Sequence, residues 1–173
     1  MTDYTYTLLI PLIPFLVFVA VGLGGHKVKP VVSGLIGTSG LGISAILSYM
    51  TAIKYFFSAH VAGAPYTALK AFEVNWLHLT DKLTINLGIL LDPISVMMLV
   101  VVTTVSFMVH LYSLGYMKGD PGYYRFFSFL SLFSFSMLGL VIATNIFQMY
   151  IFWELVGVSP FLLIGFYYEK PSA

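Results

Sequence analysis

Residues 146–168, IFQMYIFWELVGVSPFLLIGFYY, decide the fold class of this chain. The run is almost continuously apolar and is longer than the roughly 20 residues that a helix needs to cross a bilayer. Glu154 lies three residues from the middle of the run, roughly 4.5 Å from its centre along a helix axis. Placing an ionisable acid at that depth costs on the order of 2.5–3.5 kcal/mol on insertion scales. The segment therefore predicts a membrane helix with a functional residue near its centre.

The composition of the chain also indicates an integral membrane protein. Of its 173 residues, 59% are hydrophobic, 17% are aromatic and only 9% are charged, which is too few charges for a soluble domain of this length. The net charge is +1 and the basic residues are scattered, which argues against nucleic-acid binding. The absence of cysteine excludes disulfides, iron–sulfur clusters and thiolate metal sites within this chain.

Five apolar runs predict five transmembrane helices in a single membrane domain that covers residues 1–173. The predicted spans are residues 7–24, 31–53, 93–115, 123–143 and 146–168. The first of them follows an N-terminus without the positive region of a signal peptide, so we expect it to stay in the membrane. The third is expected to begin at Pro93, because proline suits the first position of a helix and Asp92 before it is a good N-cap.

Residues 54–92 show a different pattern, in which apolar and polar side chains alternate. Phe72, Val74 and Trp76 are separated by polar residues, and a second alternating run follows at residues 83–89. This period of two predicts a short β-hairpin at the membrane surface. The alternative is that residues 83–91 lengthen the third span, against which Asp92 and Pro93 argue. The predicted fold class is therefore an all-α polytopic membrane protein with a short external β-hairpin in residues 54–92.

The distribution of basic residues predicts the orientation. Those on one side of the membrane are Lys27, Lys29, Lys118, Arg125 and Lys170. Those in or beside the long loop on the other side are Lys54, Lys70 and Lys82. The positive-inside bias places the N-terminus outside and the C-terminus in the cytoplasm.

Glu154 is the strongest candidate for proton carriage. Desolvation and a nearby cation change the proton affinity of a carboxylate in opposite directions, so a glutamate between the two can load and release a proton. The alternative is a polar anchor that bonds to a neighbouring helix. No lysine or arginine lies in the interior of a predicted span. We therefore expect that Glu154 either remains protonated or has its counter-ion in another chain or in sequence beyond Ala173.

Two further residues are candidates for a proton path or its support. Pro160 leaves the carbonyl of Val156 without its helical N–H partner, and a kinked stretch there could admit water; the alternative is a kink used only for packing. His110 lies near the cytoplasmic end of the third span, and histidine titrates near neutral pH. The interpretation favoured for His110 is an interfacial hydrogen-bonding residue.

The remaining polar residues predict packing and not chemistry. Small and hydroxyl side chains in the second and fourth spans are expected to let helices approach closely and to form hydrogen bonds; they are Ser33, Gly37, Ser44, Ser48, Ser128, Ser131 and Ser134. The loop histidines His26, His60 and His78 have no ligand spacing, so no metal site is predicted. The chain also has no Walker loop, dinucleotide fingerprint or nucleophile elbow.

Several motifs together resemble one family. They are His110-Leu111-Tyr112-Ser113, residues 120–127 (DPGYYRFF), residues 152–157 (FWELVG) and residues 168–173 (YEKPSA). The chain resembles the N-terminal part of the largest antiporter-like membrane subunit, subunit L, of bacterial proton-pumping NADH:quinone oxidoreductase, respiratory complex I. The resemblance is dense from Leu91 to Ala173 and looser before that.

The resemblance implies a function and partners. Glu154 matches the glutamate that such subunits use in proton translocation, whose partner in the family is a lysine on a later helix, and His110 matches a family histidine. The expected partners are other membrane subunits of complex I, the lipid bilayer and protons. NADH, flavin, iron–sulfur clusters and quinone are expected in partner subunits, with no cofactor in this chain. The expected location is the bacterial cytoplasmic (inner) membrane, and the expected enzyme is a translocase of which this chain is a subunit.

Two alternatives remain at this stage. The first is the large subunit of a multisubunit sodium/proton antiporter, which shares these motifs. The second is a purely structural module, in which Glu154 fixes helix packing.

Overall fold

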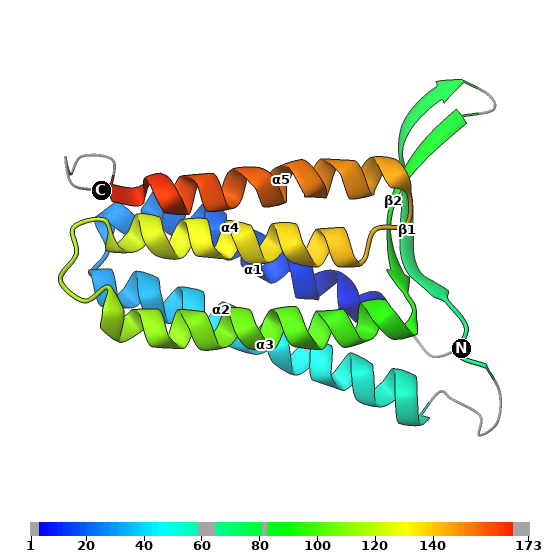
Figure 1. Ribbon diagram of the computed structural model, residues 1–173, viewed down its shortest axis with the longest axis horizontal. Coiled ribbons are helices and arrows are strands. Elements are labelled where there is room, and N and C mark those ends of the chain that lie inside the picture. The colour runs from blue at the N-terminus through cyan, green and yellow to red at the C-terminus, as the bar shows by residue number, and fades with distance from the viewer. Residues whose placement is uncertain (1–3, 59–64, 81–82, 168–173) are drawn as a thin grey trace.

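Five long helices lie side by side in the computed structural model, which describes residues 4–58, 65–80 and 83–167 (Figure 1). A two-stranded antiparallel sheet crosses one end of this bundle, the end at which the described chain begins (Figure 1). His60, the turn residues 81–82 and the segment 168–173, which entered the predictions above, lie outside the described residues.

All five helices are long and apolar enough to cross a membrane, as the sequence predicts. Their bounds are α1 Leu9–Gly24, α2 Pro30–Ile53, α3 Pro93–Tyr116, α4 Tyr123–Val141 and α5 Ile146–Ile164. Short turns extend three of them, namely Thr5–Leu8 before α1, Gly25–Lys27 after α1, Lys54–Ser58 after α2 and Gly165–Tyr167 after α5.

The starts of α3 and α5 follow directly from local sequence. Asp92 accepts a hydrogen bond from the backbone N–H of Ser95 at 2.6 Å, and the Ser95 hydroxyl accepts one from the N–H of Asp92 at 2.8 Å. This reciprocal capping box satisfies two backbone donors and confirms that α3 begins at Pro93. Asn145 caps α5 in a simpler way, because its side chain accepts from the N–H of Gln148 at 2.9 Å.

The predicted hairpin is confirmed. β1 Leu69–Thr80 pairs with β2 Leu83–Leu91, with Phe72 opposite Ile89. The alternative in which residues 83–91 lengthen the third span is wrong, because they form a strand. β2 is held on the bundle: Ile89 is buried, and the backbone N–H of Leu90 donates to the carbonyl of Ile142 at 2.9 Å. That bond lies just after α4, which ends at Val141 and not at residue 143 as predicted.

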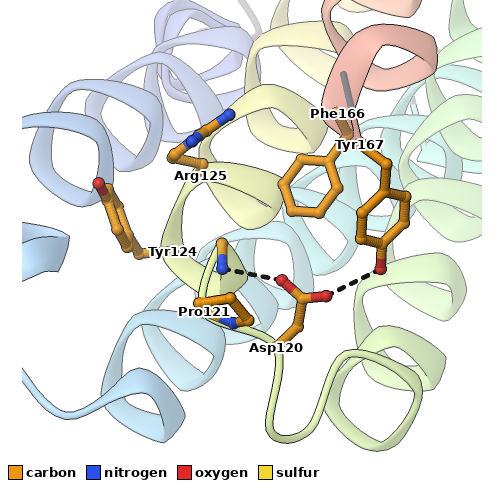
Figure 2. A pocket seen from close by; sticks show the side chains of 7 residues that line it. Asp120, Pro121, Tyr124, Arg125, Phe166 and Tyr167 are labelled. Carbon is orange, nitrogen blue, oxygen red and sulfur yellow. Dashed lines mark hydrogen bonds between the residues drawn. The ribbon is translucent and has the colours of Figure 1, made fainter. Parts of the chain in front are cut away.

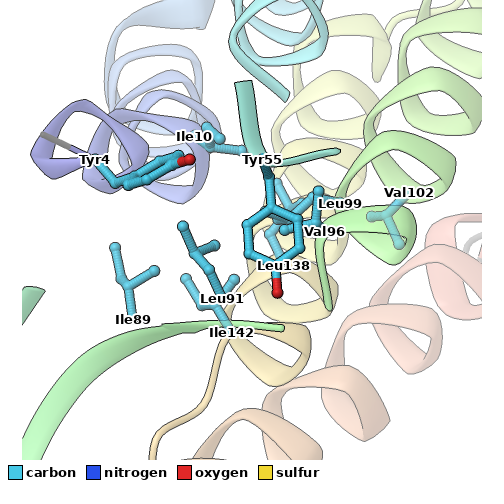
Figure 3. Packing of buried hydrophobic residues seen from close by; sticks show 10 residues of the cluster. All are labelled: Tyr4, Ile10, Tyr55, Ile89, Leu91, Val96, Leu99, Val102, Leu138 and Ile142. Carbon is cyan, nitrogen blue, oxygen red and sulfur yellow. The ribbon is translucent and has the colours of Figure 1, made fainter. Parts of the chain in front are cut away.

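Two clusters of buried side chains hold the bundle, one near each end. The cluster at the hairpin end joins the start of the chain to the strands and to α2, α3 and α4 (Figure 3); its members are Tyr4, Ile10, Tyr55, Ile89, Leu91, Val96, Leu99, Val102, Leu138 and Ile142. The cluster at the opposite end centres on Phe127, with Val21 from α1 and Phe166 from the turn after α5. Helices α1 to α4 pack on one another, whereas α5 packs mainly on α4. α5 is therefore the outermost helix of the group.

Candidate functional site

Glu154 lies on the face of α5 that points away from the other helices. Its side chain is exposed in this chain, as are those of Tyr150, Val158 and Phe161 one or two turns away along the same face. The described residues do not bury Glu154, so its burial in the membrane interior stays a prediction. The sequence of α5 is apolar on both faces and does not indicate which face packs against α4.

Among the described residues, Tyr150 lies next to Glu154 on the exposed face of α5. It precedes Glu154 by one helical turn, and its side chain is exposed on the same face. Tyrosine O–H can donate to an ionised carboxylate or accept from a protonated one. Within residues 4–58, 65–80 and 83–167, the one ion pair joins Lys70 to Glu73 and does not involve Glu154.

The opposite face of α5 is fitted closely to α4. Phe152 packs directly over Gly139, where there is no room for a Cβ atom. The buried hydroxyl of Ser159 lies 3.3 Å from that of Ser136 on α4 and donates to the Leu155 carbonyl of its own helix at 2.7 Å. α5 continues past Pro160 to Ile164, so the proline does not end the helix.

Gln148 anchors the first turn of α5 to the hairpin and is a residue that the sequence analysis missed. Its side chain is 4% exposed. Its amide nitrogen donates to the carbonyl of Gly88 at 2.9 Å, and its amide oxygen accepts from the N–H of Gly88 at 3.0 Å and from the Thr144 hydroxyl at 3.1 Å. Asn145 adds a further bond, from its side-chain nitrogen to the Asn86 carbonyl at 2.5 Å. A lone glutamine in an otherwise apolar run was the signal, because buried polar side chains need partners.

His110 is fully buried between α3, α4 and α2. Its Nδ1 lies 2.8 Å from the Ser106 carbonyl and its Nε2 lies 3.3 Å from the Ser131 hydroxyl. Phe127 packs against the ring with centroids 5.8 Å apart, and Gly37 of α2 lies beside it. The interpretation of His110 as an interfacial residue is wrong, because the ring faces the interior of the bundle; the expectation that it forms hydrogen bonds is confirmed.

The bonds around His110 are compatible with two protonation states. A carbonyl can only accept, so Nδ1 carries a proton and donates to Ser106. In the neutral ring Nε2 is an acceptor, and the Ser131 hydroxyl can donate either to it or to the Phe127 carbonyl, which lies 2.8 Å away. In the charged ring Nε2 donates to Ser131, whose hydroxyl then donates to Phe127. No hydrogen bond has to be broken without replacement when the ring gains or loses a proton.

The small and hydroxyl side chains of the second and fourth spans pack as predicted. Most of the buried hydroxyls bond to the carbonyl one turn earlier, as Ser134 does to Leu130 at 3.0 Å. Ser128 instead donates across helices to the Phe18 carbonyl of α1 at 3.1 Å. The hydroxyls of Ser33 and Thr38 are buried without a hydrogen-bond partner among the described residues.

The described residues do not bring the candidates into one cluster. The hydrogen bonds of His110 lead to α4, whereas Glu154 lies on the far side of α5. The described part of the chain also contains no group of three His, Cys, Asp or Glu side chains that could hold a metal ion. Glu154 and His110 are therefore two separate protonatable positions, one on the surface of the chain and one inside it.

Comparison with known proteins gives consistent matches. Residues 76–127 match the family model of the N-terminus of chain 5 of NADH-ubiquinone oxidoreductase (complex I). The chain is 43% identical over 170 residues to chloroplastic NAD(P)H-quinone oxidoreductase subunit 5 of Zygnema circumcarinatum, covering 97% of this chain and 24% of that protein. It is 42% identical to the same subunit of Marchantia polymorpha, covering 95% of this chain and 23% of that protein.

A bacterial protein matches over the whole chain. NADH-quinone oxidoreductase subunit L of Neisseria meningitidis serogroup B is 40% identical over 177 residues, covering 100% of this chain and 25% of that protein. The chain thus spans about a quarter of the length of the curated relatives that it matches. Over that quarter of their length, the chain is similar to the chain 5, or subunit L, family of complex I membrane subunits.

Proposed function

We propose that this chain forms part of a transmembrane proton path in the membrane arm of an NADH:quinone oxidoreductase, and that Glu154 carries the proton. The observation that carries the proposal is the position of this carboxylate on α5. The span that contains α5 runs over Ile146–Tyr167, so Glu154 lies roughly 4 Å from its midpoint along the axis. Ionisable residues at such depth almost always face a protein interior or a water-filled cavity, not lipid.

The exposed face of α5 around Glu154 is suited to contact with another protein surface. Exposed apolar side chains flank the carboxylate on both sides along α5, so a helix could pack there and enclose it. The relatives are about four times as long as this chain, and the missing cover is supplied in this proposal by the rest of such a subunit. A basic side chain on the covering helix would then serve as the counter-ion that the spans of this chain lack.

The proton is loaded and released as charge near Glu154 changes. A cation that approaches the carboxylate favours its ionised form, and withdrawal of the cation favours protonation. Tyr150, one turn earlier on the same face, can donate to the carboxylate or accept from it. Pro160 leaves the Val156 carbonyl without an N–H partner about half a turn beyond Glu154, and this oxygen provides an acceptor for water.

His110 forms a second protonatable position of the same path. Its hydrogen bonds accommodate both charge states of the ring, which suits a group that passes a proton on. The buried hydroxyls on α2 and α4 extend from it along the bundle. In this role His110 transfers protons inside the described bundle. Glu154 transfers protons at the interface between α5 and the protein surface that covers it.

The proposed assembly is based on the complex I subunits that the chain resembles. The redox reaction belongs to partner subunits, which hold NADH, flavin, iron–sulfur clusters and quinone. The membrane is the bacterial cytoplasmic membrane, with the N-terminus and the hairpin on its outer side and the C-terminus in the cytoplasm. The hairpin and the start of the chain lie at the same end of the bundle (Figure 1), which is consistent with this orientation. Residues 1–173 form one membrane domain of the subunit.

The test replaces Glu154 with glutamine in the intact complex. Glutamine keeps the size and hydrogen-bonding capacity of the side chain but cannot carry a proton. We expect proton uptake into sealed membrane vesicles, driven by NADH and followed with a pH-sensitive dye, to fall several-fold while the complex still assembles. The matched control is Glu73→Gln, which removes a carboxylate from the hairpin outside the spans. Unchanged proton pumping by an assembled Glu154→Gln complex would refute the carrier role and leave the residue as a packing anchor.

A further inference from the structure

Two cavities meet at Arg125, at the end of the bundle opposite the hairpin. The first, with a volume of about 310 Å³, has a polar wall formed by Asp120, Arg125 and Tyr167, with Phe166 beside them (Figure 2). The second is an apolar groove between α1 and α4 with a volume of about 400 Å³. Phe18, Val19 and Leu23 of α1 and Phe129 of α4 line this groove together with Arg125. We call them the terminal cavity and the α1–α4 groove.

The groove runs from the end of the bundle toward its middle. Arg125 lies in the first turn of α4, and Phe129 lies one turn further along, which is about 6 Å deeper. The Ser128 hydroxyl donates to the Phe18 carbonyl at 3.1 Å and ties the two walls together. The Arg125 guanidinium therefore lies at the open end of the groove, and the deeper part of the groove is apolar. The ring of Phe166 lies beside the Arg125 guanidinium, with 5.7 Å between the charge and the ring centroid.

The described residues at this end of the bundle carry an excess of positive charge. Lys27, Lys29 and Lys118 are exposed in the turns beside Arg125. The one acid described there is Asp120, and both of its oxygens already accept hydrogen bonds. They accept from the N–H of Gly122 at 2.8 Å and from the Tyr167 hydroxyl at 2.9 Å (Figure 2). The surface thus attracts anions, and the groove beneath it accepts hydrocarbon.

We propose that an anionic phospholipid binds at this place, with its phosphate at Arg125 and one acyl chain in the α1–α4 groove. Basic pockets between transmembrane helices are suited to anionic headgroups, and the planar fork of arginine matches the oxygens of a phosphate. The terminal cavity has room for the glycerol and headgroup beside the phosphate. Such a lipid bridges α1, α4 and the turn after α5, and it seals the bundle on the side where α1 and α4 meet. The inference concerns lipid binding and does not depend on the proposed proton path.

A photo-crosslinking experiment on the intact membrane complex tests the proposal. The probe is a phosphatidylglycerol with a diazirine in one acyl chain, and the labelled residues are mapped by peptide mass spectrometry. We expect labelling of residues 18–23 and 125–129 that unlabelled phosphatidylglycerol competes away and phosphatidylcholine does not. Labelling should fall several-fold in Arg125→Gln, because the phosphate loses the guanidinium that lines both cavities and binds its oxygens.

Two further variants distinguish binding at this site from non-specific electrostatic attraction of anionic lipid. Val19→Trp fills the groove without changing charge and should reduce labelling as strongly as Arg125→Gln. Lys118→Gln removes a charge at the same end of the bundle, outside both cavities, and should label like the unmodified chain. Equal labelling of all variants, or equal competition by phosphatidylcholine, would overturn the proposal. Absence of labelling at residues 18–23 and 125–129 in the unmodified complex would overturn it as well, since protein then covers the groove.

Discussion

Replacement of Gln148 with leucine is expected to release the hairpin from α5. The substitution removes two hydrogen bonds to the backbone of Gly88, of 2.9 and 3.0 Å. It leaves the N–H and the carbonyl of this buried glycine without those partners. At about 1 kcal/mol for each bond, and more where a buried donor stays unsatisfied, the loss is about 2–4 kcal/mol. Since 1.4 kcal/mol corresponds to a factor of ten, local opening at Gly88 should become about 30-fold to several-hundred-fold more frequent.

Hydrogen–deuterium exchange of the intact protein measures this change directly. Exchange in the peptide that contains Gly88 reports the local opening free energy. The matched control is Met149→Leu, one position along, where the side chain is 42% exposed. A less than threefold increase for Gln148→Leu, or an equal increase for Met149→Leu, would refute the assignment of Gln148 as the anchor between the strands and α5.

Two further predictions concern the α4–α5 contact and the hairpin. Gly139→Ala should lower the free energy of unfolding by about 1–3 kcal/mol, because the new methyl group collides with Phe152 and overpacks the contact. Thermal unfolding measures this loss. The control Gly115→Ala should show no comparable loss, because the space around Gly115 is open. Lys70→Met should raise the pKa of Glu73, because the hydrogen bond from Lys70 is the main cause that holds this pKa below its ordinary value. The stabilisation that the lowered pKa gives the hairpin is complete above about pH 4.3, the ordinary pKa of glutamate. This stabilisation is lost as pH falls through the lower pKa of the folded state. NMR titration of labelled glutamate measures the pKa of Glu73 in both proteins. An unchanged pKa in Lys70→Met would contradict the role of Lys70.

Much of the fold could be predicted because its signals are local. The apolar runs are long enough to specify spanning helices without knowledge of their neighbours. Asp92 and Pro93 specify the start of α3 by backbone chemistry within four residues, and the capping box is present. The alternating residues before them specify strands for a similar reason, since a period of two places the apolar side chains on one face of the strand.

The positions that could not be predicted depend on contacts between distant segments. The end of α4 is shifted because β2 bonds to the Ile142 carbonyl, and no pattern within α4 encodes that strand. His110 lies close to a helix end in sequence, yet α2 and α4 cover it completely. Gln148 is a single polar residue among apolar ones, and its partner Gly88 lies 60 positions earlier in the chain. In each case the missing information was tertiary.

The exposure of Glu154 restricts how α5 can function. A carboxylate facing hydrocarbon costs on the order of 2.5–3.5 kcal/mol, and the described contacts of Glu154 include one tyrosine and no cation. α5 itself is held by one face on α4 and by the Gln148 anchor at its first turn. A helix that is fixed on one side and bears an unpaired acid on the other is suited to receive a second protein surface. We therefore expect the surroundings of Glu154 to be completed by a second surface that covers this face, and not by the five helices that present it.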